Sequence, residues 1–306
     1  MKQLFLHIGM HKTGTSAIQA FLNRSSKELK SKGFLYPNSY RDNNISSSMH
    51  VGHHRLAWAT INRYASKYDE TISDEPWKLL NREIKEKQSE KVVISSEFFW
   101  PADQIEIDKI SEHLSDYDVK ILLYLRNSLG LAVSLYKQDV KTGICSSNFR
   151  EYTKSKLWVH DYDAIIRKWN NSFEKKNIQL KIYDKVKSNL IEDFCNTIKY
   201  KNNSIINEKI VQNKSPSNNL IKILLFLNFM ESKTKNYLNI PFNRIRRNIL
   251  MRRIPGKYIA NISERILNAD LLSDGDIFFF LDKVSAYNEI FLNKWIKDDD
   301  KSYFKF

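Results

Sequence analysis

Short apolar runs alternate with longer stretches of helical spacing along the first two thirds of the chain. The nearly continuous apolar runs predict buried strands at 2–8, 91–96, 119–126 and 178–183. Residues 34–37 predict a further short extended segment, and the polar residues 38–50 predict a loop. In the other stretches apolar residues recur with helical periodicity, which predicts helices at 15–30, 52–66, 74–88, 103–114, 129–141, 161–175 and 190–198.

This order of elements predicts the fold class. Strands separated by helices need crossover connections, which produce a mostly parallel sheet with helices on both sides. Strands that are apolar on both faces agree with such burial. We therefore expect an α/β fold in which 1–306 form one domain. Its core would cover about 1–217, and the residues of about 218–306 would form a helical extension.

A loop between the first strand and the first helix carries the most distinctive chemistry. Gly9 and Gly14 have the spacing of the glycines in a Walker A loop, but Thr15 stands where that loop has its lysine, and Lys12 lies inside the loop. A helix that begins after such a loop offers unpaired N–H groups and a partial positive charge to an anion. The loop therefore predicts a phosphate-type site, to which hydroxyl donors are added by Thr13, Thr15 and Ser16.

A second cationic position follows the strand predicted at 119–126. Arg126 ends that strand, and Ser134 lies eight residues later in the next helix. In open α/β sheets, ligands bind beyond the carboxyl ends of the strands, so Arg126 and the loop are expected at the same edge. The planar guanidinium group suits a phosphate, because it can donate to two oxygens at once.

These segments together resemble the sulfotransferase family, and in particular its bacterial members. The resemblance covers about 3–217 and is carried by the residues 11–16, by 125–127 and by 134–136. It implies a P-loop-like sulfotransferase fold and the donor 3′-phosphoadenosine 5′-phosphosulfate (PAPS), with 3′,5′-adenosine bisphosphate (PAP) as product and no metal. The 5′-phosphosulfate would be bound by Lys12, Thr13, Gly14, Thr15 and Ser16, with His11 beside it, and the 3′-phosphate by Arg126 and Ser134.

The chain departs from the family at one point. Many cytosolic members close the nucleotide site with a late glycine-rich loop, and the sequence has no such loop here. The segment 213–217 stands at a comparable place, so Asn213 and Ser215 are the expected replacements on that side of the nucleotide.

Sulfonyl transfer to a hydroxyl group or an amine also needs a base to accept the acceptor's proton. Glu97 directly follows the strand at 91–96, and a carboxylate whose pKa is raised by burial can serve as a base. His53 and His54 lie at the start of a predicted helix, and histidine titrates near neutrality. Family members use a histidine or a glutamate, so Glu97 and the histidine pair remain alternatives, with His54 preferred within the pair.

Composition narrows the classes of partner. The net charge of +14 favours anionic partners, and basic residues gather at 244–253. The resemblance implies an acceptor, which we expect to be a carbohydrate or glycan, an acidic one included, and the extension at about 218–306 would form part of its cleft. The charge is compatible with contact to a membrane surface. The two cysteines are isolated and no zinc-site spacing occurs, so no metal is expected. Neither a signal peptide nor a membrane-spanning run is visible, which favours a cytoplasmic protein.

Two other classes compete with this interpretation. A P-loop kinase needs the Walker lysine after Gly14 and an acidic residue for magnesium at a strand end. A basic nucleic-acid-binding protein would use the cluster at 244–253, but no aromatic residues are interleaved there. The sequence favours the sulfotransferase over both, and no nucleic-acid partner is expected.

Overall fold

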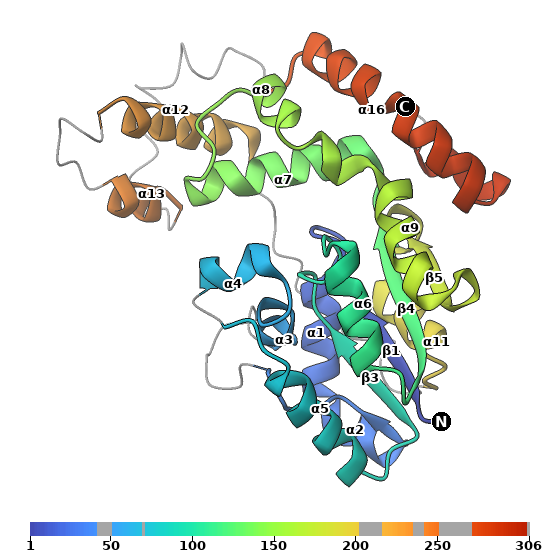
Figure 1. Cartoon of the computed structure of the whole chain (residues 1–306). Coiled ribbons are helices and arrows are strands. Elements are labelled where there is room, and N and C mark those ends of the chain that lie inside the picture. The colour runs from blue at the N-terminus through green and yellow to red at the C-terminus, as the bar shows by residue number, and fades with distance from the viewer. Residues whose placement is uncertain (42–50, 69–70, 202–215, 235–241, 251–270, 305–306) are drawn as a thin grey trace. The chain divides into compact units, whose positions relative to one another are not determined.

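A parallel sheet forms the centre of the computed structural model, which describes residues 1–41, 51–68, 71–201, 216–234, 242–250 and 271–304. Its five strands run in the order β2-β3-β1-β4-β5, and every neighbouring pair is parallel (Figure 1). This confirms the predicted α/β fold. The strands are β1 (Gln3–His7), β2 (Phe34–Leu35), β3 (Lys91–Ser95), β4 (Asp118–Leu125) and β5 (Ile178–Ile182).

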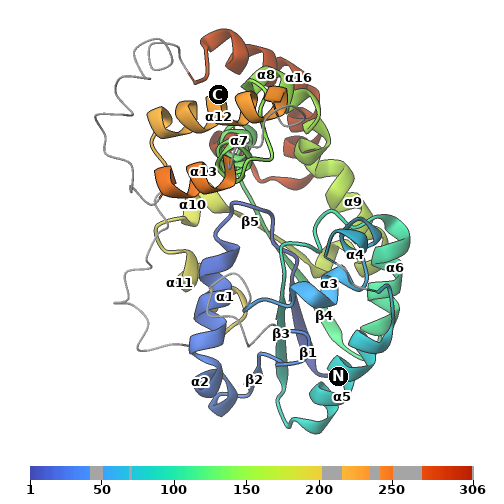
Figure 2. The same ribbon diagram turned by 90° about the vertical axis from the view of Figure 1, so that its left-hand side faces the viewer.

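Helices cover both faces of this sheet, as the doubly apolar strands require. Figure 2 shows α1 (Thr15–Arg24), α2 (Ser26–Ser31) and α11 (Leu190–Thr197) on one side. On that side Phe5, Val93 and Tyr124 of the strands pack with Phe21, Leu22 and Phe194 of the helices. The other side of the sheet in the same view is covered by α5 (Glu75–Glu86), α6 (Gln104–His113) and α9 (Tyr162–Phe173).

Two of the predicted helices are each divided in the structure. The stretch 15–30 breaks at Ser25, between α1 and α2. The stretch 52–66 contains α3 (His54–Trp58) and α4 (Asn62–Tyr68) with a turn between them. At that turn the Thr60 hydroxyl donates to the Leu56 carbonyl (2.7 Å) and accepts from the Trp77 indole (2.9 Å). This tertiary bond explains why helical periodicity alone does not reveal the break.

The chain divides into two compact units. The first contains the sheet and consists of Met1–Arg126, Tyr162–Ile210 and Trp295–Phe306. Besides the elements above, it holds the short elements η2 (Lys175–Asn177), α10 (Tyr183–Val186) and η4 (Asp298–Phe304). The second unit consists of Asn127–Asp161 and Val211–Lys294. The expectation of one sulfotransferase domain over the whole chain stays a prediction.

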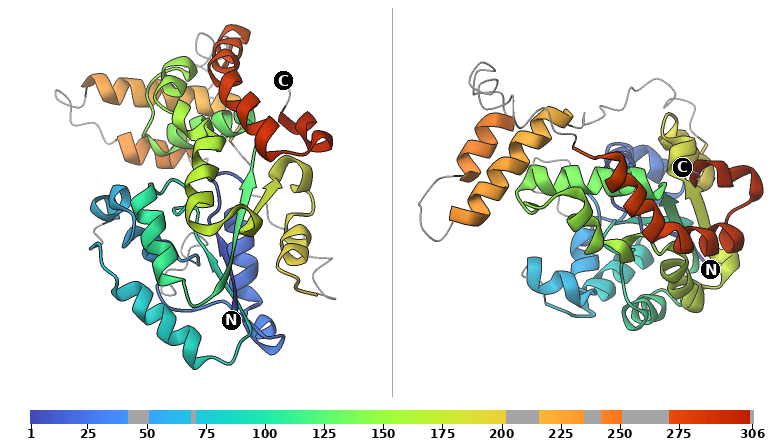
Figure 3. Two further views of the ribbon diagram at one scale, coloured as in Figure 1. Left: turned by 45° about the vertical axis from the view of Figure 1, so that its right-hand side comes forward. Right: turned by 90° about the horizontal axis from the view of Figure 1, so that it is seen from above.

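The second unit is helical in the part that the structure describes. It contains α7 (Ser128–Thr142), α8 (Phe149–Lys154), η1 (Leu157–His160), α12 (Asn218–Thr234), α13 (Phe242–Leu250) and α16 (Asp274–Trp295), whose last residue belongs to the first unit. Figure 3 shows α12 beside α7, with α13 next to α12. Its apolar core joins Tyr136 of α7, Phe149 of α8 and Phe280 of α16. No helix in the described ranges is long and apolar enough to cross a membrane.

Candidate active site

The predicted site residues of the first unit gather at one edge of the sheet. His7 at the end of β1 is in register with Ser95, the last residue of β3. Leu125 at the end of β4 is in register with Ile182 at the end of β5. Because the strands are parallel, the segments that follow them leave the sheet at the same edge. These segments are the loop at 8–14, residues Ser96 and Glu97, Arg126, and the start of α10.

The loop before α1 is shaped by its own backbone and hydroxyl groups. Lys12 (φ +66°) and Gly14 (φ +81°) both adopt the left-handed conformation. The hydroxyl groups of Thr13 (2.7 Å) and Thr15 (3.3 Å) donate to the Met10 carbonyl. Gly14 is the N-cap of α1, no side chain caps the helix there, and its first turn holds no acidic residue. The start of α1 therefore keeps the backbone donors and the partial charge that attract an anion.

Gly14 is also a position of close packing, which leads to a stability prediction. A Cβ atom at Gly14 would lie 2.2 Å from Cδ2 of Leu190, in a backbone conformation that disfavours side chains. We expect Gly14→Ala to lower the free energy of unfolding by about 1–3 kcal/mol or more. Gly33→Ala is the matched control, because Gly33 has φ +79° and nothing within 4 Å of its added Cβ. Urea denaturation should show a larger loss for Gly14→Ala; equal losses would contradict the close packing against Leu190.

Arg126 is held beside this loop by three groups. Its Nη1 donates to the Lys12 carbonyl (3.2 Å), its guanidinium carbon lies 5.6 Å from the centre of the Tyr183 ring, and its Nε lies 3.9 Å from Oδ1 of Asp184. The backbone is also fixed, because the Tyr162 hydroxyl donates to the Arg126 carbonyl (2.6 Å). The Nε atom is buried and donates no hydrogen bond. A buried donor without an acceptor is costly, and an anionic oxygen would satisfy it.

These observations fit a phosphate- or sulfate-bearing ligand. The uncapped start of α1 offers backbone donors, and the Arg126 Nε donates no hydrogen bond although the Asp184 carboxylate lies 3.9 Å away. The Lys12 side chain adds a full positive charge from a loop position that is half-buried. The chemistry of this edge is therefore that of an anion site with several donors.

Glu97 provides the acidic group at the same edge. Its Oε2 accepts from the amide of Gln19 (3.1 Å) and lies 3.8 Å from Nδ1 of His54. Burial acts to raise the pKa of Glu97, but His54, His11 and the Gln19 hydrogen bond outweigh it and leave the pKa below its ordinary value. The net shift of this pKa is therefore opposite to the one that would make Glu97 a stronger base.

The two adjacent histidines have different surroundings. His53 is fully buried, its Nδ1 accepts from the backbone N–H of Ser95 (3.3 Å), and its Nε2 faces the Pro37 carbonyl (3.2 Å). Burial holds the pKa of His53 well below its ordinary value. Both of its nitrogens are thus occupied by backbone groups, so it fits a structural part better than the part of a base. The neutral ring joins the end of β3 to the segment after β2.

His54 instead faces side chains of the site. Its Nδ1 lies 2.9 Å from the Ser96 hydroxyl, and its ring stacks on Trp58 and meets the edge of Phe98. Phe98 also contacts the ring of His11, which places His11 of the loop near this histidine. Of the two candidate histidines, His54 is the one beside an anionic partner.

Several predicted residues are not joined to this cluster by the structure. Ser16 is exposed in the first turn of α1, and Ser134 is half-buried in α7 of the second unit. Asn213 and Ser215 lie outside the described residues, as do Arg252 and Arg253 of the basic cluster. Roles for these residues stay predictions.

Other residues of the site were not singled out from the sequence. The predicted residues are contacted directly by Gln19, Ser95, Ser96, Tyr183 and Asp184. Ser95 and Ser96 could have been found from the sequence, because they stand at the end of β3 and ligands bind beyond the carboxyl ends of parallel strands. The Gln19 contact had no such signal, because it depends on which face of α1 meets β3.

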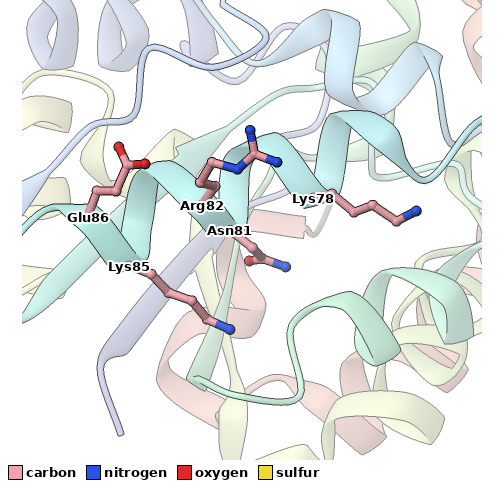
Figure 4. A pocket seen from close by; sticks show the side chains of 5 residues that line it. All are labelled: Lys78, Asn81, Arg82, Lys85 and Glu86. Atoms are coloured by element: carbon pink, nitrogen blue, oxygen red, sulfur yellow. The ribbon is translucent and has the colours of Figure 1, made fainter.

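A surface hollow lies elsewhere, on α5. Figure 4 shows that it is lined by side chains of this single helix, and none of the predicted site residues is among them. Its lining consists of Lys78, Asn81, Arg82, Lys85 and Glu86. Within the described ranges no three histidine, cysteine, aspartate or glutamate side chains gather closely enough to hold a metal ion.

Comparisons with known proteins address the family. Among solved structures the chain is similar to the crystal structure of a sulfotransferase from Alicyclobacillus acidocaldarius, with 16% identity and a TM-score of 0.45 over 78% of this chain and 98% of that one. No curated protein matches the sequence. The family described as "Sulfotransferase domain" matches residues 2–241. Since this match spans most of the sequence, the chain belongs to the sulfotransferase family, whose enzymes use PAPS.

Proposed function

We propose that this chain transfers the sulfonyl group of PAPS to a hydroxyl or amine of an acceptor at the sheet edge described above. Three features around the loop support this: the uncapped start of α1, the positive charge of Lys12, and the Arg126 Nε, which donates no hydrogen bond. His11 of the same loop lies near Glu97, whose pKa it helps to lower. Anion-binding groups and a carboxylate–imidazole pair thus occupy one edge.

The residues of the loop hold the donor in this proposal. When bound, PAPS supplies an activated sulfonyl group, whose bond to a phosphate oxygen breaks as its sulfur bonds to the acceptor. Lys12 neutralises the charge that develops on the leaving phosphate oxygen, a type of stabilisation that contributes strongly to rate. The hydroxyl groups of Thr13 and Thr15 donate within the loop, so they shape it while the backbone N–H groups at the start of α1 meet the 5′ end.

Arg126 holds the 3′-phosphate. Its guanidinium is fixed against the Tyr183 ring and the Lys12 carbonyl, so little side-chain freedom is lost on binding. We also propose that the nucleotide is contacted by Ser134, Asn213 and Ser215, and this part of the proposal is supported only by the family resemblance.

His54 accepts the acceptor's proton, and Glu97 is its anionic partner. The lowered pKa of Glu97 makes the carboxylate a weak base. A carboxylate beside an imidazole stabilises the protonated ring, which is the form that the ring takes after accepting a proton. Glu97 as the base itself is the alternative, and the two are separated by mutation below.

The acceptor is a carbohydrate or another glycan in this proposal. Its support is the resemblance to bacterial sulfotransferases, and the net charge of +14 favours an acidic glycan. Labelled PAPS should be tested against a panel of neutral and acidic glycans, steroids and tyrosine peptides. Transfer to glycans is expected, and transfer confined to phenols, steroids or peptides would overturn this part.

Binding of PAP tests the donor site directly. We expect PAP to raise Tm without added metal, whereas ATP with magnesium leaves Tm unchanged. Arg126→Ala should weaken PAP binding by about 10- to 100-fold, because a hydrogen bond to a charged group is lost. Calorimetric titration measures this affinity.

The control for Arg126→Ala is Arg167→Ala, which removes a partly exposed arginine paired with Asp163 (2.9 Å) on α9. Its PAP affinity should match that of the unchanged protein. Stabilisation by ATP with magnesium and not by PAP would favour a kinase and overturn the proposal.

A further inference from the structure

Gln19 connects the helix of the donor loop to the acidic group of the site. It lies four residues after Thr15 in α1, and it is 1% exposed. Its amide nitrogen donates to Oε2 of Glu97 (3.1 Å) and lies 3.4 Å from the hydroxyl oxygen of Ser95. The amide is therefore buried between α1 and the end of β3, where the Glu97 carboxylate and the Ser95 hydroxyl oxygen accept from it.

The backbone at Gly52 lies directly against this amide. A Cβ atom at Gly52 would stand 2.6 Å from Nε2 of Gln19 and 2.8 Å from Cε1 of His54. Only a residue without a side chain lets the chain pass this close. Gly52 thus packs against both the Gln19 amide and the His54 ring, and a methyl group at this position would displace both.

We propose that Gln19 is a positioning residue for sulfonyl transfer: its amide holds the Glu97 carboxylate beside His54 and fixes both relative to the helix that begins at the donor loop. This inference rests on the proposed function, since it assumes that the pair serves the acceptor. The hydrogen bonds of the Gln19 side chain go to Glu97 and Ser95, so we expect it to act through Glu97.

The charges around Glu97 show what the amide adds. A hydrogen bond that donates to an ionised carboxylate favours the ionised form, and the Gln19 bond is one of the contributions that lower the pKa of Glu97. Loss of the donor should therefore raise this pKa. The other titratable groups that interact with Glu97 are His11 of the loop, His54 of α3, His7 of β1, Tyr36 after β2 and Tyr64 of α4.

A purely structural part for Gln19 is the alternative. The Ser95 hydroxyl also meets Nδ1 of the buried His7 (2.9 Å), so Gln19 belongs to a polar network at the end of β1 and β3. If filling that network were its only part, substitution would lower stability and leave the titration of Glu97 unchanged. The two readings thus differ in a measurable quantity.

The experiment compares Gln19→Met with Gln3→Met in the full chain. Methionine keeps the length of the side chain and removes the amide. Gln3 is the matched control, because its amide donates to Asp118 (3.2 Å) at the other end of β1. The first readout is the pKa of Glu97, followed by carbon-13 NMR of labelled glutamate carboxyls and assigned by the signal that Glu97→Gln removes.

We expect Gln19→Met to raise the pKa of Glu97 and to lower kcat by about tenfold, while PAP affinity stays within about twofold. Gln3→Met should change none of the three. An unchanged Glu97 titration with unchanged kcat in folded Gln19→Met would overturn the inference, as would equal effects of Gln3→Met. If Gln19→Met does not fold, Gln19→Asn, whose shorter side chain withdraws the amide from Glu97, should raise the same pKa, and an unchanged pKa there would also overturn it.

The titration separates this inference from the proposed function. It needs neither donor nor acceptor, so it reports on the hold of Gln19 on Glu97 even if no sulfonyl transfer is found. Failure of PAP binding would remove the proposed function while the pKa comparison stands. If the unchanged protein binds PAP and transfers the sulfonyl group, but Gln19→Met changes neither kcat nor the pKa of Glu97, only the positioning role of Gln19 is overturned.

Discussion

Replacing Lys12 with alanine is expected to lower kcat by about 10²- to 10³-fold, because in the proposed reaction Lys12 neutralises the charge that develops on the leaving phosphate oxygen. The fold should be retained, since the backbone carbonyl of Lys12, which accepts from Arg126, stays in place in the variant. Alanine keeps that carbonyl and meets the same left-handed backbone as lysine. The free energy of unfolding should change by less than about 1 kcal/mol.

The measurement is steady-state kinetics at saturating acceptor together with PAP titration and urea denaturation. Lys27→Ala, at an exposed position of α2, is the control for loss of one positive charge. It should leave kcat and PAP affinity unchanged. Turnover of Lys12→Ala near that of the unchanged protein, with normal stability, would contradict the part given to Lys12.

Removing the base should have the second large effect. We expect His54→Gln to lower kcat by about 10²- to 10⁴-fold, the usual contribution of a positioned proton acceptor. Glu97→Gln keeps the shape of the side chain and removes its charge, so its loss should be smaller, on the order of tenfold for one pKa unit of lost interaction. Kinetics of both variants with the same acceptor measure the difference. A larger loss in Glu97→Gln than in His54→Gln would identify Glu97 as the base.

Stability against acid gives a check on the same carboxylate. The native pKa of Glu97 lies below its ordinary value of 4.5, so its stabilising contribution is complete above that pH. The contribution is lost as the pH falls below 4.5 and through the native pKa. Urea denaturation of Glu97→Gln should show a smaller loss of stability in that acid range than the unchanged protein. An identical loss would mean that the neighbours of Glu97 do not favour its ionised form.

The sheet could be predicted because burial on both faces leaves a direct mark on the sequence. The central strands β1, β3 and β4 each hold a buried apolar run, and the loop at 8–14 combines glycine spacing with Lys12 after a strand end. These patterns each lie within one short segment of the sequence, so they can be recognised without knowing which distant residues pack against that segment. The break between α3 and α4 could not be predicted because the bond between Thr60 and Trp77 that accompanies it joins positions 17 residues apart.

The electrostatics of the site could not be predicted in the same way. Burial alone raises the pKa of a carboxyl group, and only the arrangement of His11, His54 and Gln19 around Glu97 reverses the sign. His53 and His54 are neighbours in sequence and share a helix start, yet one bonds to backbone groups and the other faces the carboxylate. Which neighbour does which depends on the path of the chain after β2, and no residue pattern records that path.

The route of the chain between the two units limits how the protein can be divided. It leaves the sheet unit after Arg126, returns at Tyr162, departs again beyond Ile210 and comes back at Trp295. Trp295 then donates to Asp163 of α9 (2.7 Å). Shortening the chain at residue 217 would remove α12 and α16 and leave the apolar faces of α7 and α8 bare. Each unit is thus completed by residues from distant parts of the gene product, so neither can be released by a single cut.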